Sequence, residues 1–117
     1  MHTVDYSTKS LTMNSKKIIH LGGRLHRSYE EISFLKADVN YTRIHFKSGE
    51  TELVATNLGQ IEKRLPEGLF YRVNRSTIIN LDMKDLQIAA DSIRKNKKPL
   101  FKISKRRKQG LLEVLNL

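Results

Sequence analysis

A strict two-residue alternation in the middle of the chain constrains its fold more than any other pattern. Over residues 41–47, YTRIHFK, every second residue is small or apolar and the residues between them are polar. Successive side chains of a strand point to opposite faces, so this run predicts a strand with one buried and one exposed face. The Ser48-Gly49 pair then predicts a turn into a second strand, ETELVA, at residues 50–55. The centre of the chain is therefore expected to form an antiparallel hairpin.

Further short strands are expected on both sides of this hairpin. The candidate segments are residues 16–21, 32–36, 70–73, 86–90 and 99–104. RSTIINL (75–81) is expected to be a tight turn or a helical turn, and DSIRKNKK (91–98) a polar turn between the last two strands.

Three helical segments are indicated by capping residues and spacing. Ser28 and Glu31 form a capping box for a single helical turn. Apolar residues recur at helical spacing within residues 56–68, which predicts a short amphipathic helix. Ser104 is the expected N-cap of a terminal helix over residues 105–117.

These elements predict one domain that is mainly β with short helices, built from antiparallel sheet and closed by a C-terminal helix. A length of 117 residues suits a single domain. Residues 1–15 are polar and lack periodicity, so we expect a flexible N-terminal arm there and the folded domain over residues 16–117.

The charge of the chain points to an anionic partner. The formal net charge is +10, and nearly all of the excess lies in residues 92–112, which hold nine Lys or Arg and no Asp or Glu. The rest of the chain holds 13 basic against 12 acidic residues. A local excess of this kind is typical of a surface that binds phosphate groups, with a disordered basic tail as the alternative.

Catalysis, metal binding and membrane insertion are not indicated. The chain has no cysteine, its four histidines lack the spacing of metal ligands, and no phosphate-cradling glycine motif is present. No run approaches the roughly 18 apolar residues of a membrane span, and the N-terminus lacks an export signal. We therefore expect a cytoplasmic protein that is not an enzyme and needs no cofactor.

The first turn of the expected terminal helix is basic. Cations there oppose the helix dipole, so the sequence KRRK at residues 105–108 does not serve helix stability. Such a helix start is suited to bind phosphates and base edges, with a solvated basic turn as the alternative. Arg106 lies nearly opposite the apolar face of the helix. That face is formed by Leu111, Leu112, Val114 and Leu115.

The segment LFYRVNRSTIINL (69–81) mixes apolar residues with two arginines and contains no acidic residue. Unpaired arginines are costly to bury, so Arg72 and Arg75 are expected to point outward toward a partner.

The segments FYRVNRSTIINL and FKISKRR, in this order, resemble the LytTR-type DNA-binding domain of bacterial transcription regulators. The resemblance covers about residues 15–115. The chain departs from the family pattern at Asn74, where His is usual, and at Thr77, where Tyr or Phe is frequent. The resemblance implies an elongated β-fold that lays loops into successive major grooves of duplex DNA, as the effector domain of a response regulator.

The resemblance also implies roles for individual residues. The predicted base-contacting residues are Thr42, Arg75 and Arg106. The predicted phosphate-contacting residues are Asn40, Tyr41, Arg72, Asn74, Ser76, Lys102, Ser104, Lys105, Arg107 and Lys108.

The expected partner is double-stranded DNA with paired half-sites, on which two copies form a dimer, with an upstream sensor or receiver protein as a further partner. Receiver domains often precede this domain in the family, and 117 residues leave no room for one, so the chain is either free-standing or cut from a longer regulator. Two alternatives remain open. One is a basic RNA-binding or ribosome-associated module, and the other is a protein that docks on an acidic protein partner.

Overall fold

The alternating run at the centre of the chain forms strand β4 (Tyr41–Phe46), which pairs antiparallel with β5 (Thr51–Val54). The predicted central hairpin is thus confirmed. The structure is a computed structural model that describes residues 17–82, 86–88, 92–95 and 98–115. The expected N-terminal arm lies outside the described residues.

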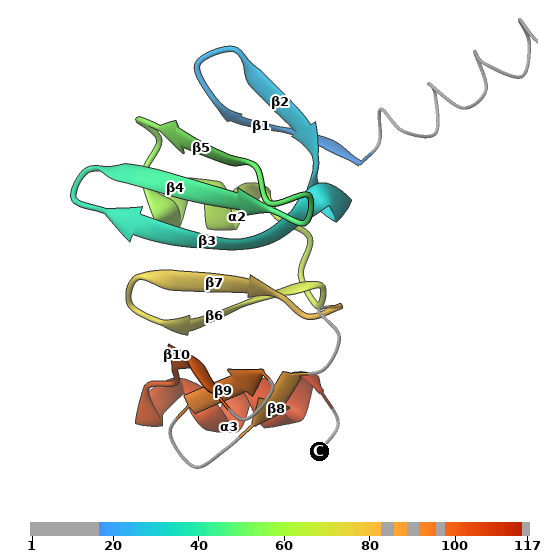
Figure 1. The fold of residues 1–117 in the computed structure, drawn as a ribbon, viewed down its shortest axis with the longest axis vertical. Coiled ribbons are helices and arrows are strands. Elements are labelled where there is room, and N and C mark those ends of the chain that lie inside the picture. The colour runs from blue at the N-terminus through green and yellow to red at the C-terminus, as the bar shows by residue number, and fades with distance from the viewer. Residues whose placement is uncertain (1–16, 83–85, 89–91, 96–97, 116–117) are drawn as a thin grey trace, which may run out of the picture.

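Three antiparallel sheets are stacked along the long axis of an elongated molecule measuring 54 × 32 × 23 Å (Figure 1). A hairpin of β1 (Ile18–Gly22) and β2 (Leu25–Ser28) lies at one end. The five-stranded sheet in the middle has the order β5-β4-β3-β7-β6. At the other end lies a three-stranded sheet with the order β10-β9-β8.

The remaining strands and the helices have these bounds. In the central sheet they are β3 (Ile32–Asp38), β6 (Phe70–Asn74) and β7 (Thr77–Asn80). The third sheet consists of β8 (Leu86–Ile88), β9 (Ser92–Lys95) and β10 (Lys98–Lys102). The helical elements are η1 (Tyr29–Glu31), α2 (Leu58–Arg64) and α3 (Lys105–Val114). None of the described helices is long and apolar enough to cross a membrane.

The predicted helix starts are confirmed. Ser28 and Glu31 form the capping box, in which the Ser28 hydroxyl accepts from the Glu30 N–H and the Ser28 N–H donates to Glu31. Asn57 caps α2 by accepting from the Gln60 N–H at 2.8 Å. Ser104 is the N-cap residue of α3, although its hydroxyl makes no capping hydrogen bond.

Two predicted turns contain strands instead. Residues 75–81 were expected to be a turn, but only Arg75, Ser76 and Leu81 are turn residues, and β7 lies between them. All four residues of β7 are buried because both faces of the sheet are covered there, so the strand lacks the alternation that marks a half-exposed strand. Residues 91–98 likewise contain β9, whose Ser92 and Ile93 are buried.

Two apolar clusters lie on opposite faces of the β6–β7 pair. One contains Ile78 together with Leu35, Ile44 and Ile61, and it joins α2 and β1 to the central sheet. The other contains Ile79 together with Val73, Phe101 and Leu111, and it joins the third sheet and α3 to the same two strands. Because Ile78 and Ile79 are neighbours in sequence, β7 contributes to both clusters.

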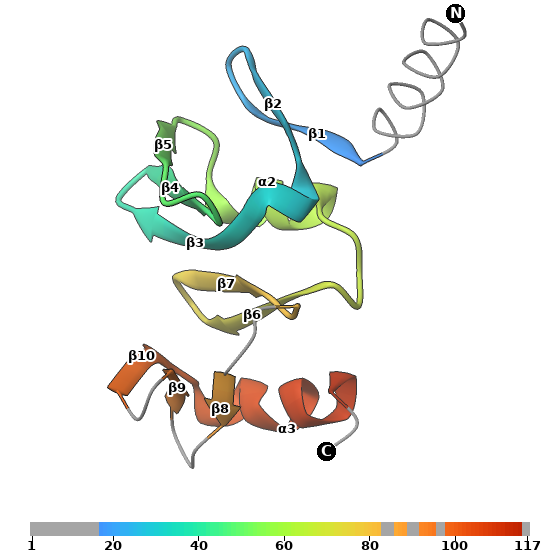
Figure 2. The ribbon, with the colours of Figure 1, turned by 45° about the vertical axis from the view of Figure 1, so that its right-hand side comes forward.

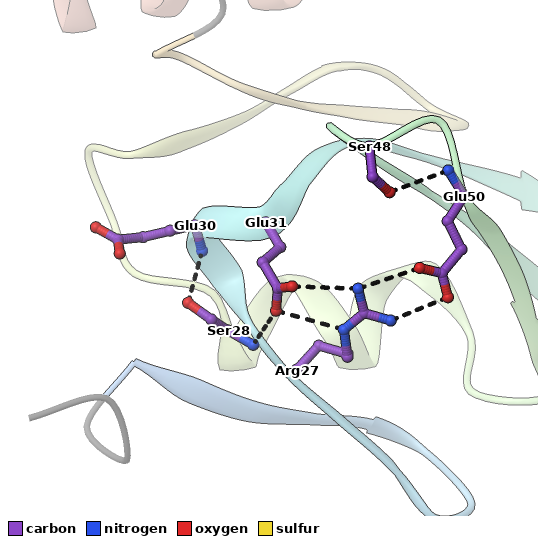
Figure 3. Close-up of polar contacts among 6 residues, drawn as sticks. All are labelled: Arg27, Ser28, Glu30, Glu31, Ser48 and Glu50. Carbon is purple, nitrogen blue, oxygen red and sulfur yellow. Dashed lines mark hydrogen bonds and ion pairs between the residues drawn. The ribbon is translucent and has the colours of Figure 1, made fainter. Parts of the chain in front are cut away.

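A charged clamp holds the β1–β2 hairpin against the β4–β5 turn (Figure 3). The Arg27 guanidinium donates to both carboxylate oxygens of Glu31 at 3.2–3.3 Å and to both of Glu50 at 3.2–3.4 Å. It also lies over the Phe46 ring, 4.0 Å from the centroid. The hydrogen bonds that Arg27 donates lower the pKa of Glu31, and its bonds to Glu31 and Glu50 raise the pKa of Arg27.

Helix α3 packs closely against β6 through Gly110. A Cβ atom at this position would collide with the Tyr71 hydroxyl, so glycine is needed for the approach. The Tyr71 hydroxyl donates to the Arg107 carbonyl at 2.7 Å, and Arg107 Nη1 donates to the Arg72 carbonyl at 3.3 Å. These bonds fix the start of α3 relative to the end of β6.

We expect Arg27→Ala to lower the free energy of unfolding at pH 7 by about 1–2 kcal/mol, since partly exposed ion pairs and one cation–π contact are lost. The depressed pKa of Glu31 means that the ion pair contributes above the unfolded-state pKa and is lost as the pH falls through the folded-state pKa. The variant should therefore lose less stability on acidification than the wild type. Urea denaturation at pH 7 and pH 3 measures both effects. Arg24→Ala is the matched control, and an acid sensitivity unchanged in Arg27→Ala would contradict the clamp.

We expect Gly110→Ala to lower the free energy of unfolding by about 1–2 kcal/mol, because overpacking against Tyr71 outweighs the roughly 1 kcal/mol that alanine gains over glycine in a helix. Gly59→Ala in α2 is the control, since a Cβ there meets its nearest atom, Asn57 Oδ1, at 3.5 Å. Thermal and urea unfolding of the two variants should move in opposite directions. A stabilised Gly110→Ala protein would show that Tyr71 moves aside at no cost.

Candidate nucleic-acid interface

Turns from distant parts of the chain gather along one side of the molecule, which we call the turn edge. It consists of the β3–β4 turn with the first residue of β4 (39–41), the β5–α2 link (55–57), the β6–β7 turn (75–76) and the β10–α3 junction (102–106). In Figures 1 and 2 the β3–β4 turn, the β6–β7 turn and the start of α3 lie on the same side in both views.

Hydrogen bonds connect these turns in a row. The Ala37 N–H donates to the Ser76 carbonyl at 2.9 Å and joins the end of β3 to the β6–β7 turn. The Ser104 N–H donates to the Val73 carbonyl at 3.0 Å and joins the start of α3 to the end of β6. The hydroxyl of Thr42 donates to the Thr56 carbonyl at 2.7 Å and joins β4 to the β5–α2 link.

The β6–β7 turn is braced by two polar side chains of β6. Asn74 Nδ2 donates to the Lys102 carbonyl at 2.7 Å, and Asn74 Oδ1 accepts from the Ser76 N–H at 2.9 Å and from its hydroxyl at 3.2 Å. Arg72 donates to Glu62 at 2.9 Å and to the Arg75 carbonyl at 2.6 Å. The backbone of the turn is therefore fixed both to α2 and to β10.

Two arginines on this edge have free side chains. Arg75 and Arg106 are exposed, and neither guanidinium has a protein partner among the residues that the structure describes. Lys102 and Lys105 are exposed beside them, while Lys108 is half-buried. The first turn of α3 has no acidic residue. The turn edge thus carries unpaired positive charge on a fixed backbone.

The structure separates the predicted contact residues into free and internally bonded ones. Asn40 and Tyr41 are exposed at the β3–β4 turn, as a contact role requires. By contrast, three predicted contact residues already donate hydrogen bonds to other groups of the protein: Arg72, Asn74 and Arg107. Arg72 was expected to point outward, but Glu62 pairs with it.

The position of Thr42 corrects one prediction. Thr42 was expected to reach a base, but its side chain is fully buried and its hydroxyl is used by the Thr56 carbonyl. The same alternation that buries Ile44 and Phe46 puts Thr42 on the inner face of β4. The apolar face of α3 is also narrower than predicted, because Val114 is 41% exposed while Leu111 is buried.

Arg24 is a free cation that the sequence analysis did not single out. It is exposed in the β1–β2 turn and has no side-chain partner within the described ranges. His20 Nε2 donates to the Gly23 carbonyl at 2.8 Å and braces this turn. A Cβ on Gly22 would lie 2.6 Å from Thr56 Oγ1, so the hairpin passes close to the β5–α2 link. The sequence Gly22-Gly23-Arg24 could have indicated this residue, because a pair of glycines predicts a turn and a turn exposes the cation beside it.

An aromatic stack links the central sheet to the third sheet. The rings of Phe34 and His45 are stacked with centroids 4.1 Å apart, and Phe101 meets Phe34 edge-on at 4.8 Å. Burial lowers the pKa of His45, and the positive charges of Arg43 and Lys36 lower it further. These effects favour the neutral form of the imidazole.

Comparisons with known proteins identify this arrangement. The sequence model of the LytTr DNA-binding domain matches residues 23–116. Among solved structures, the chain is similar to a LytTr DNA-binding domain from Bacillus cereus, in a protein described as a methyl-accepting/DNA response regulator, with a TM-score of 0.66 and 15% identity. That match covers 86% of this chain and 98% of the other, and it shows a shared fold. No curated protein matches the chain. With most of its length matched by the sequence model, the chain belongs to the family of LytTr DNA-binding domains.

Proposed function

We propose that this protein is a sequence-specific regulator of transcription that binds duplex DNA along the turn edge. The observation that carries the proposal is the pair of free arginines, Arg75 and Arg106, each set on backbone that is hydrogen-bonded to a neighbouring element. A rigid backbone with a free guanidinium suits base recognition, because little conformational freedom is lost on binding. In this arrangement the turns and the start of α3 enter major grooves.

The side chains of the turn edge divide into three roles in this proposal. Arg75 and Arg106 read bases, since Arg most often makes a bidentate bond to guanine O6 and N7. Phosphates are bound by Asn40, Tyr41, Ser76, Lys102, Ser104, Lys105 and Lys108, with Arg24 as an additional contact. Arg72, Asn74 and Arg107 hold the backbone of the readers in place. Thr42 remains a core residue.

The proposal also covers how the protein assembles on DNA and where in the cell it acts. Two copies bind paired half-sites and form a dimer on the DNA, and a sensor or receiver protein acts upstream in the cytoplasm. The full or partial burial of most described Phe and Tyr side chains argues against an RNA-binding module. Single-stranded RNA is bound largely by stacking on several exposed rings, whereas Phe46, Phe70 and Phe101 are buried in the core and Tyr41 is the one exposed Phe or Tyr among the described residues.

We expect Arg106→Ala to weaken binding to the cognate duplex by about 1–3 kcal/mol and to relax preference at one base pair, while binding to scrambled duplex changes little. Arg106→Lys should recover little specificity, because an ammonium lacks the fork geometry of the guanidinium. Fluorescence anisotropy at one fixed salt concentration, on a site selected from random duplexes, measures each variant.

Lys63→Ala is the matched control for Arg106. Lys63 is exposed in the last turn of α2, and that end of the helix points away from the side of the turn edge in Figure 2, so the same loss of charge there should leave base preference intact. Equal weakening of Arg106→Ala on cognate and scrambled duplexes would make Arg106 a phosphate contact. A preference of the wild type for structured RNA over every duplex would replace the proposed function.

We also expect affinity to fall steeply with salt. Neutralising about 5–8 phosphates gives a slope of log K against log salt of about −5 to −7. Lys105→Ala should reduce the magnitude of that slope by about one and weaken cognate and scrambled duplexes alike. Titrations over a range of salt concentrations test this, and a slope near zero would rule out phosphate binding as the main source of affinity.

A further inference from the structure

The β3–β4 turn has an unusual residue at its tip. Asp38 pairs with Tyr41, so the turn between the strands contains only Val39 and Asn40. Val39 has a φ of 59°, the one positive value at a non-glycine position in the described part of the chain. Its side chain is 91% exposed, against 48% or less for every other large apolar residue that the structure shows to be exposed.

Valine is poorly suited to this position. In two-residue hairpin turns, a positive φ at the first position is normally supplied by Gly, Asn or Asp. A β-branched residue there is an outlier, because its Cβ substituents collide with the backbone. Strain of this kind, found on an exposed tip where the side chain gains almost no burial, points to a role outside the folding of the isolated chain.

The tip lies on the turn edge beside the proposed base readers. Ala37 is the second-to-last residue of β3. Its N–H donates to the carbonyl of Ser76, which directly follows Arg75. An ion pair between Asp38 and Arg43, at 3.6 Å, supports the base of the turn. The β3–β4 turn, which contains Val39, therefore lies on the same side of the molecule as the β6–β7 turn (Figures 1 and 2).

We propose that Val39 reads a thymine by apolar contact with its C5-methyl group, an inference that rests on the proposed DNA-binding function. Of the groups that base edges present in the major groove, the thymine methyl is the apolar one, and small apolar side chains recognise it. Burial of the Val39 side chain against this methyl supplies the apolar contact that the isolated chain lacks. Val39 thus adds to the arginines a specificity determinant for A·T pairs.

Replacement of thymine by deoxyuridine tests the contact, because it removes the methyl group and leaves base pairing intact. The probe is the duplex selected from random sequences, with each thymine replaced singly. The wild type should lose about fourfold in affinity when one particular thymine of each half-site is replaced. This loss corresponds to the free energy of burying about one methyl group. Val39→Gly, which has no side chain, should bind the thymine and deoxyuridine duplexes with nearly equal affinity at that position, and Val39→Ala should keep only part of the preference.

Leu69→Ala is the matched control. Leu69 is 45% exposed and precedes β6, at the end of that strand opposite the β6–β7 turn, so its variant should keep the full thymine preference. Val39→Gly should in addition raise the urea midpoint of unfolding, because glycine adopts a positive φ without strain. Loss of thymine preference in a more stable protein excludes misfolding as its cause.

The outcomes distinguish this inference from the function on which it rests. Failure of the wild type to prefer any selected duplex over scrambled DNA would overturn the proposed function itself. Sequence-specific binding that is insensitive to deoxyuridine at every position would overturn only the Val39 contact. A thymine preference that persists unchanged in Val39→Gly would assign the methyl group to another side chain and equally overturn the inference.

Discussion

The structure depends on a single short strand that is buried on both faces. β7 lies between β3 and β6, and its adjacent residues Ile78 and Ile79 belong to different apolar clusters. Its buried Asn80 is satisfied by donating to the Ile32 carbonyl at 2.8 Å and accepting from the Asp82 N–H at 3.0 Å. A shift of this strand by one residue would exchange the two faces and disrupt both clusters. The position of the Arg75–Ser76 turn is fixed by the same register.

This arrangement explains which parts of the fold could be predicted from the sequence. Strand β4 has one exposed face, so its alternation is visible in the sequence alone. Strand β7 has none, and its burial is set by α2 and α3, which are distant in sequence. A run such as Thr77–Asn80 therefore reads as a turn until its neighbours are known. The helix starts were predicted correctly, because the residues of a cap lie within one turn of each other.

The same distinction holds for the candidate site. The outward direction of Arg106 follows from helical geometry within one element, and the structure agrees with it. The internal partners of Arg72 and Asn74 lie in α2 and β10, and no local pattern reveals them. For Thr42, by contrast, a local pattern does predict the observed position. The alternation that predicts β4 already places this residue on the buried face, and the family resemblance had suggested a different role.

The braces of the turn edge share one chemical property. Arg72 bonds the carbonyl of Arg75, Asn74 that of Lys102, Tyr71 that of Arg107, and Arg107 that of Arg72. In each of these four bonds the acceptor is a main-chain oxygen, which is present whatever side chain the residue carries. Exchanging the side chain at residue 75 or 102 would therefore leave its brace intact. Under the proposed function, evolution or protein engineering can therefore change which sequence the edge reads, one side chain at a time, without rebuilding the scaffold that presents it.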